Sequence, residues 1–205
     1  MTAAERTYGG RAVSDRLADR RRRFLDAALD EFSTKGYAAS SVTSLCKAAG
    51  LSRRQFYELF ADREDLLIAI YDEIQGGARL AVSEALSDNP SRDLRDLATT
   101  AMRAYMSSVG TDPRRAEVSF VQVVGVSSRV EQHRIDGREE WVDFFVATMA
   151  DVAARPPSDR QRHLAIGFVG ALTGLVHRWS SSDDPAPLGD IVDVLADILL
   201  AFTTL

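Results

Sequence analysis

Polar residues between positions 52 and 59 could contact the base edges of DNA. Arg53, Arg54 and Gln55 stand next to one another at the beginning of a short predicted helix. An arginine can donate two hydrogen bonds to guanine O6 and N7, and a glutamine can pair in two places with adenine. A short helix with these side chains on its free face fits the major groove, although each of the three could also be an ordinary solvated residue. The segment predicts contact with duplex DNA.

The stretch from residue 41 to residue 60 predicts a helix-turn-helix, with the turn at Gly50. The first helix has apolar residues at helical spacing: Val42, Leu45, Cys46 and Ala49. Gly50 can adopt the positive φ of a sharp turn, and Ser52 followed by Gln55 forms a capping box that opens the second helix. Many helical hairpins bind no nucleic acid, so the flanking sequence matters.

Four segments follow one another here at linked spacings. They are RFLDAALDEF at 23–32, KGY at 35–37, FYELF at 56–60 and DREDLL at 62–67. Together with the helix-turn-helix they resemble the N-terminal domain of the TetR family of transcriptional regulators, over about residues 20–71. The combination of spacings is specific, whereas no single segment is.

The resemblance implies further DNA contacts outside the three base-reading candidates. Ser41 matches a threonine that caps the first hairpin helix and contacts phosphate, and Thr43 stands where the family often has a DNA-facing polar residue. Tyr57 matches a tyrosine whose hydroxyl meets a phosphate, and Arg63 matches a lysine that does the same. The expected DNA-binding residues are Ser41, Thr43, Arg53, Arg54, Gln55, Tyr57 and Arg63.

Two departures from the family pattern leave the operator sequence undetermined. Arg54 replaces a small residue common near the start of the recognition helix, and Leu59 replaces a frequent histidine or tyrosine. The resemblance also places one or two arginines of the run 20–23 near a phosphate. Arg6 and Arg11 could reach the minor groove from residues 1–14, which are expected to form a flexible arm; a solvated tail is the alternative.

The charge distribution agrees with a nucleic-acid partner at one end of the chain. The net charge is −5, but residues 1–65 carry 12 Lys and Arg against 10 Asp and Glu, whereas residues 66–205 carry 13 against 20. The acidic remainder should repel phosphate and orient the basic end toward DNA. Cys46, the only cysteine, excludes an intrachain disulfide, and is either a small core residue or a redox-sensing thiol.

The expected fold class is all-α, because no β-type alternation is sustained. We predict an arm over 1–14, a three-helix helix-turn-helix DNA-binding domain over 15–62, and a larger regulatory and dimerisation domain over 63–205. In the last of these, a helix over 63–86 connects the domains, and Gly76-Gly77 could kink it. No run of 18 apolar residues and no signal-type segment occurs, so the expected location is cytoplasmic, without a membrane partner.

An aromatic and methionine-rich set from successive helices could line a pocket for a small apolar or aromatic effector, or could be packed core. The candidate pocket residues are Met102, Tyr105, Met106, Phe120, Val124, Trp141, Phe144, Phe145, Met149 and Phe168. Such pockets are what the family resemblance implies.

The last two helices carry wide apolar stripes, and three glycines between positions 167 and 174 imply close approach of another helix or a ligand. In the family these helices form a four-helix interface between two subunits. The expected homodimer interface residues are Leu164, Leu172, Leu175, Trp179, Ile191, Leu195, Ile198 and Phe202. The alternative is that both stripes serve only the subunit's own core.

The sequence therefore predicts a dimeric regulator, most simply a repressor, on a palindromic operator of double-stranded DNA, released by a ligand. A regulator without a small-molecule inducer, or a helical carrier, are the alternatives. The three histidines are scattered and no nucleophile or phosphate-loop motif occurs, so we expect no enzyme, no cofactor and no metal.

Overall fold

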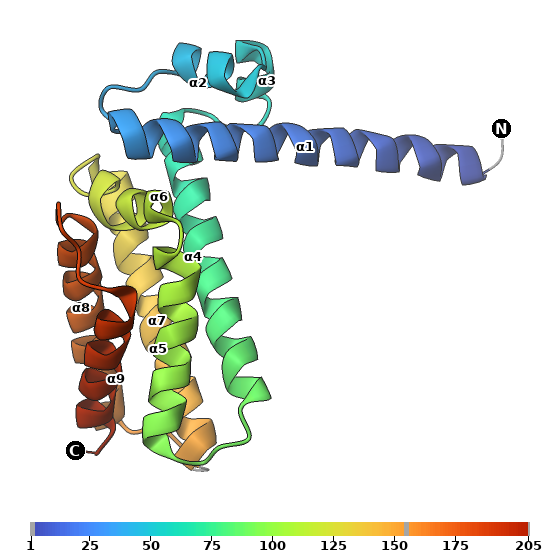
Figure 1. Ribbon diagram of the computed structural model, residues 1–205. Helices are drawn as coiled ribbons and strands as arrows, with labels where there is room; N and C mark the ends of the chain where they lie inside the picture. Colours follow the sequence, from blue (N-terminus) through green and yellow to red (C-terminus); the bar gives the residue numbers. More distant parts are fainter. Residues whose placement is uncertain (1–2, 154–155, 205) are drawn as a thin grey trace. The chain divides into compact units, whose positions relative to one another are not determined.

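The computed structural model describes the backbone of residues 3–153 and 156–204 and the side chains of residues 14–151 and 156–201 (Figure 1). All regular structure in this part of the chain is helical. The helices are α1 (Ala3–Lys35), α2 (Val42–Ala49), α3 (Arg53–Tyr57), α4 (Arg63–Asp88), α5 (Leu94–Gly110), α6 (Pro113–Ala116), the π-helix η1 (Glu117–Gln122), α7 (Ser128–Ala153), α8 (Asp159–Ser180) and α9 (Leu188–Thr204). The all-α prediction is confirmed.

The chain divides into two compact units, Met1–Ile70 and Tyr71–Leu205, here called the N-terminal and C-terminal units. The division falls inside α4, beyond the boundary predicted after residue 62. The reason is that Leu66, Leu67 and Ile70, at the beginning of α4, are buried.

Aromatic rings hold the N-terminal unit together. Phe24 of α1 meets Phe56 of α3 edge to face, with ring centroids 5.3 Å apart, and meets Phe60 at 6.1 Å. Both Phe24 and Phe56 are fully buried. Edge-to-face pairs of this kind add to the burial of the rings. This cluster fixes α3 on α1 by one face and leaves its other face outward.

In the C-terminal unit, α5 packs against α9, and α8 packs against both α7 and α9 (Figure 1). The core of this unit contains Met102, Tyr105 and Met106 of α5, together with Phe168 of α8 and Leu195 of α9. The second half of α4 joins this bundle through an ion pair between Arg79 and Glu140, whose closest atoms are 2.7 Å apart.

The helices differ in detail from the sequence-based expectation. The backbone of residues 3–14 was expected as a flexible arm but is helical and forms the beginning of α1. The side chains of residues 1–13 lie outside the described set. Residues 113–122 form α6 followed directly by the π-helix η1, and Gly125, beyond the end of η1, has a φ of 72°. α4 passes through Gly76 and Gly77 without interruption.

Candidate nucleic-acid interface and internal cavity

The predicted helix-turn-helix forms through the local signals that the sequence contains. Ser41 caps α2, where the Ser44 N–H donates to Ser41 Oγ at 3.0 Å and the Ser41 N–H donates to Ser44 Oγ at 2.9 Å. Gly50 ends α2 at a φ of 61°, in the left-handed region. Glycine is favoured there because it has no Cβ to clash with the backbone.

The outward face of α3 presents the residues expected to meet DNA. Arg53 and Arg54 are exposed, and the Tyr57 side chain is 52% exposed. Glu58 accepts from Arg54 Nε at 3.2 Å and from Arg20 NH1 at 3.4 Å. Ser41 and Thr43 are also exposed. All five predicted residues on this side are therefore accessible to a partner.

Gln55 differs from the other base-reading candidates because its side chain already has a structural role. Its Oε1 accepts from the Ser52 N–H at 2.8 Å and from Ser52 Oγ at 3.0 Å. A bidentate contact with adenine needs that same oxygen as well as the amide nitrogen. Reading adenine with Gln55 would therefore break the side-chain half of the capping box of α3, although the Gln55 N–H could still donate to Ser52 Oγ.

Arg63, expected at a phosphate, holds the loop before α2. Its NH1 donates to the Tyr37 carbonyl at 2.9 Å, to Ser40 Oγ at 2.9 Å and to the Ser40 carbonyl. The guanidinium also lies over the Tyr37 ring, 4.7 Å from its centroid. The expected phosphate contact stays a prediction, and the structural contacts are an additional function that a lysine could not provide in the same way.

Two further residues of α1 fix the hairpin, and sequence reasoning gave neither this role. Arg23 NH2 donates to the carbonyl of Ala49 at 2.7 Å and to that of Gly50 at 3.2 Å. Glu31 is buried and accepts a hydrogen bond from the Ser44 hydroxyl. These contacts attach the turn and the first turn of α2 to α1.

Cys46 is buried in the same unit. Burial raises the pKa of its thiol, an effect that the positive charge of Arg53 partly offsets. The thiolate is the reactive form, so a raised pKa makes the thiol a poor nucleophile. The structure favours the core interpretation of this residue over the redox one.

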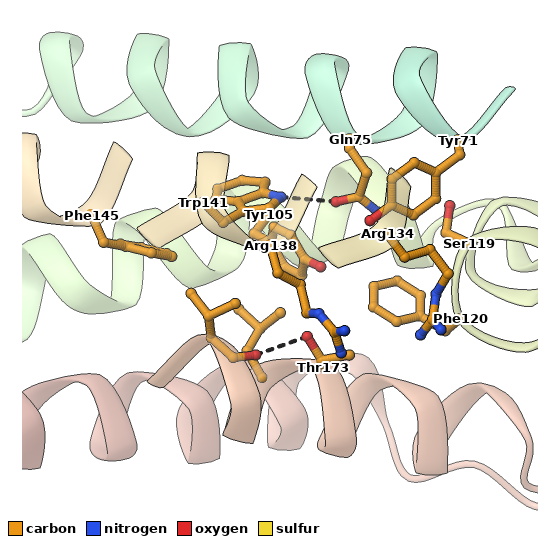
Figure 2. A pocket seen from close by; sticks show the side chains of 12 residues that line it. Tyr71, Gln75, Tyr105, Ser119, Phe120, Arg134, Arg138, Trp141, Phe145 and Thr173 are labelled. Atoms are coloured by element: carbon orange, nitrogen blue, oxygen red, sulfur yellow. Dashed lines mark hydrogen bonds between the residues drawn. The ribbon is translucent and has the colours of Figure 1, made fainter. Parts of the chain in front are cut away.

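The C-terminal unit contains an internal cavity, and four of the ten predicted pocket residues line it (Figure 2). The lining is Tyr71, Gln75, Tyr105, Ser119, Phe120, Arg134, Arg138, Trp141, Phe145, Val169, Leu172 and Thr173. The space open to the centre of a water-sized sphere measures about 20 Å³, room for about one water molecule. Pockets for drug-sized ligands measure about 300–1,000 Å³, so the cavity as it stands is too small for such a ligand.

The remaining predicted pocket residues lie elsewhere. Met102, Met106 and Phe168 are fully buried in the packed core, as large apolar side chains usually are. Val124 follows η1 and is 49% exposed. Phe144 and Met149 are half-buried, and Phe144 lines a separate surface groove beside the loop at residues 89–92.

The predicted dimer residues divide into two groups. Leu172 and Leu195 are buried within the single chain and serve its own core, Leu172 at the cavity, because an apolar stripe packs on whichever neighbour is nearest. Five others are half-buried: Leu164, Leu175, Trp179, Ile191 and Ile198. The side chain of Phe202 lies outside the described residues. On the outward face, Ile166 is 44% exposed, and a Cβ added at Gly170 or Gly174 would meet nothing within 4 Å.

An all-α chain with a capped helix-turn-helix and a separate helical unit defines a helix-turn-helix regulator of transcription. The sequence profile of the bacterial regulatory proteins of the tetR family matches residues 24–70, the same segment that forms the hairpin and its supports. Residues 24–70 are therefore a DNA-binding domain of the TetR type. Among the described residues, the helices are all too short or too polar to cross a bilayer.

Curated relatives and a solved structure resemble the chain over most of its length. The transcriptional regulator AcrR of Shigella flexneri is 26% identical over 206 residues, covering 95% of this chain and 96% of AcrR. The regulator EthR of Mycolicibacterium smegmatis is 26% identical over 175 residues, covering 84% and 76% of the two chains. FadR of Bacillus subtilis, solved with stearoyl-CoA, shares the fold with a TM-score of 0.74 and 17% identity, over 88% of this chain and 98% of FadR.

Proposed function

We propose that the protein is a repressor that binds a palindromic operator as a homodimer and leaves it when a small apolar ligand binds. The observation that carries the proposal is the exposed face of α3, where Arg53, Arg54 and Tyr57 surround the buried anchor Phe56. A capped helix held by one apolar side chain, with arginines outward, is suited to the major groove. Arg53 and Arg54 are the proposed base-reading residues.

The dimer has independent support from α8. Glycine inside a helix costs about 1 kcal/mol relative to alanine, yet Gly170 and Gly174 face open space in the single chain. A second α8 packed closely against this face would explain why side chains are absent there. Two recognition helices about 34 Å apart would then match two half-sites one DNA turn apart.

Release requires that ligand binding favour a conformation in which the two recognition helices no longer match the half-sites. α4 is a continuous helix that contributes residues 63–70 to the N-terminal unit and Tyr71 and Gln75 to the cavity lining. A ligand that binds a widened cavity more tightly than the closed one would shift α4 between two states. The small closed cavity equally suits a regulator without an inducer, and ligand-dependent release separates the two.

The test is selection of bound sequences from random duplex DNA with the purified full chain at moderate salt. We expect a palindrome, with Arg54→Gln relaxing the preference at particular bases by about 1–3 kcal/mol. Arg92→Gln, which removes another exposed arginine, in the C-terminal unit, is the control and should leave the motif unchanged. A folded protein that enriches no motif would refute the proposal, and a promoter fusion to the selected site would test whether its occupancy represses.

A further inference from the structure

Of the polar side chains that line the internal cavity, three could bind an anion. Ser119 lies on η1, and Arg134 and Arg138 lie one turn apart on α7 (Figure 2). Ser119 is only 2% exposed, and its Oγ has no hydrogen-bond partner among the residues that the structure describes. Buried hydroxyls are nearly always paired. An unpaired one on a cavity wall is available to donate to, or accept from, a group that enters the cavity.

The two arginines give this wall an excess of positive charge. Both pair with the same carboxylate, Glu131: Arg134 through a hydrogen bond, and Arg138 at 3.6 Å, beyond hydrogen-bond range. Two guanidinium groups thus share one negative charge. The Arg138 side chain is 38% exposed, so it has one end in solvent, and Figure 2 shows its guanidinium reaching toward Thr173 of α8.

The other wall is apolar and aromatic. Tyr105 and Trp141 meet edge to face at 5.3 Å, and Trp141 stacks on Phe145 at 5.6 Å. Val169 and Leu172 of α8 also line the cavity, and Phe120 lies beside Ser119 on η1 (Figure 2). The oxygen of Gln75 already accepts from the Trp141 indole, so this wall offers a ligand mainly apolar surface.

We propose that the cavity takes an apolar monocarboxylate. Its carboxylate lies between Arg138, Arg134 and the Ser119 hydroxyl, and its apolar body lies against Trp141, Phe145 and Leu172. Guanidinium groups bind carboxylates through paired, charge-assisted hydrogen bonds, and a hydroxyl adds a third donor. A cationic ligand would be repelled by the two guanidinium groups. A neutral ligand would not neutralise their excess positive charge. The inference rests on the proposed function and names the effector class for that site.

The small volume of the cavity means that binding such a ligand would change the conformation of the protein. Because about 20 Å³ cannot hold it, the ligand binds only when α7, α8 or η1 moves, and it therefore stabilises the widened state alone. The η1 segment is tied to α8 by a contact of 2.6 Å between the Phe120 carbonyl and His177 Nδ1. Movement of Ser119 toward a carboxylate is thereby coupled to α8.

The test uses calorimetric titration of the full chain, without DNA, with two matched acid and amide pairs. They are naphthalene-1-acetate with naphthalene-1-acetamide, and decanoate with decanamide, so that an aromatic and an aliphatic body are both tried. We expect at least one acid to bind at least tenfold more tightly than its amide. Arg138→Gln and Ser119→Ala should each weaken the acid at least fivefold while leaving the amide within twofold.

Arg129→Gln, an exposed arginine on the same helix but away from the cavity lining, is the control and should change neither affinity. Arg138→Lys keeps the charge and should retain part of the acid affinity, which distinguishes lost recognition from a misfolded variant. Equal binding of acid and amide, or no binding of either acid to the folded protein, would overturn the proposal. Because DNA is absent from the titration, failure of the operator proposal would not affect this result.

Discussion

The indole N–H of Trp141 on α7 donates a hydrogen bond to Oε1 of Gln75 on α4 at 2.9 Å, and both side chains are buried. The pair fixes the orientation of the ring that forms one wall of the internal cavity. It also connects α4, the helix shared by the two units, to α7. A buried donor of this kind is satisfied only as long as these two helices keep their relative position.

Gln75→Met keeps the length of the side chain and removes the acceptor. We expect the free energy of unfolding of the C-terminal unit to fall by about 1–3 kcal/mol, because the indole N–H loses its partner. The measurement is urea unfolding followed by circular dichroism. Trp141→Phe is the second arm of a double-mutant cycle. In the Trp141→Phe background, Gln75→Met should lower the free energy of unfolding much less than in the wild type. Additive effects would show that the hydrogen bond contributes nothing.

Arg63→Lys separates the two functions of this position. If the positive charge alone acts, through a phosphate, operator affinity should be almost unchanged. We expect instead a loss of about tenfold, because a lysine cannot reproduce the donors to Tyr37 and Ser40 or the stacking on the Tyr37 ring. Fluorescence anisotropy with the selected operator measures it. Wild-type affinity in the lysine variant would restore the simple phosphate-contact interpretation.

Gly50→Ala should destabilise the N-terminal unit by about 1 kcal/mol or more, since φ at this position is 61°. The new Cβ would also stand 3.0 Å from Arg23 NH2, the group that holds the turn. The control is Gly76→Ala in the middle of α4, where a Cβ meets nothing within 4 Å. That change should stabilise the protein by about 0.5–1 kcal/mol. Thermal unfolding that gave both substitutions the same sign would contradict this account.

Asp112 gives stability a small dependence on pH. Its carboxylate accepts from Arg114 NH2 at 2.7 Å and Nε at 3.0 Å, and the Arg114 side chain holds the pKa of Asp112 below its usual value. A lowered folded-state pKa means that the stabilisation is present above about pH 4, the unfolded value, and is lost as the pH falls through the folded value.

Asp112→Asn keeps the cap of α6 but removes the charge. At pH 7 it should lower the free energy of unfolding by about 0.5 kcal/mol, discounted for partial exposure. The difference from wild type should shrink steadily below pH 4. Urea unfolding at pH 7, 4 and 3 checks this, and a difference that grew toward low pH would reverse the sign of the argument.

Local signals in the sequence were sufficient for the helix-turn-helix. The positive φ of Gly50 and the capping box of Ser52 and Gln55 depend only on residues a few positions apart, so the sequence could predict them. The same was true of the end of α1, where Gly36 adopts a φ of 85°.

Relations between distant segments were not predictable in this way. Arg134 and Arg138 look like a solvated helix face in sequence, and only the tertiary fold places them on a cavity wall with Ser119. Leu172 and Leu195 belong to apolar stripes, but a stripe does not say whether its neighbour is in the same subunit or another. Nothing in the residues 117–122 predicted a π-helix.

The commitment of Gln55 to the Ser52 cap has a consequence for how this regulator changes over evolutionary time. Arg53 and Arg54 have no part in that cap. Under the proposed function, mutations at these two positions would alter which promoters the protein recognises while the helix remained intact. A mutation at position 55 would alter recognition and folding together and would be removed by selection more often. Descendants of this protein should therefore diverge in their target genes through positions 53 and 54 first.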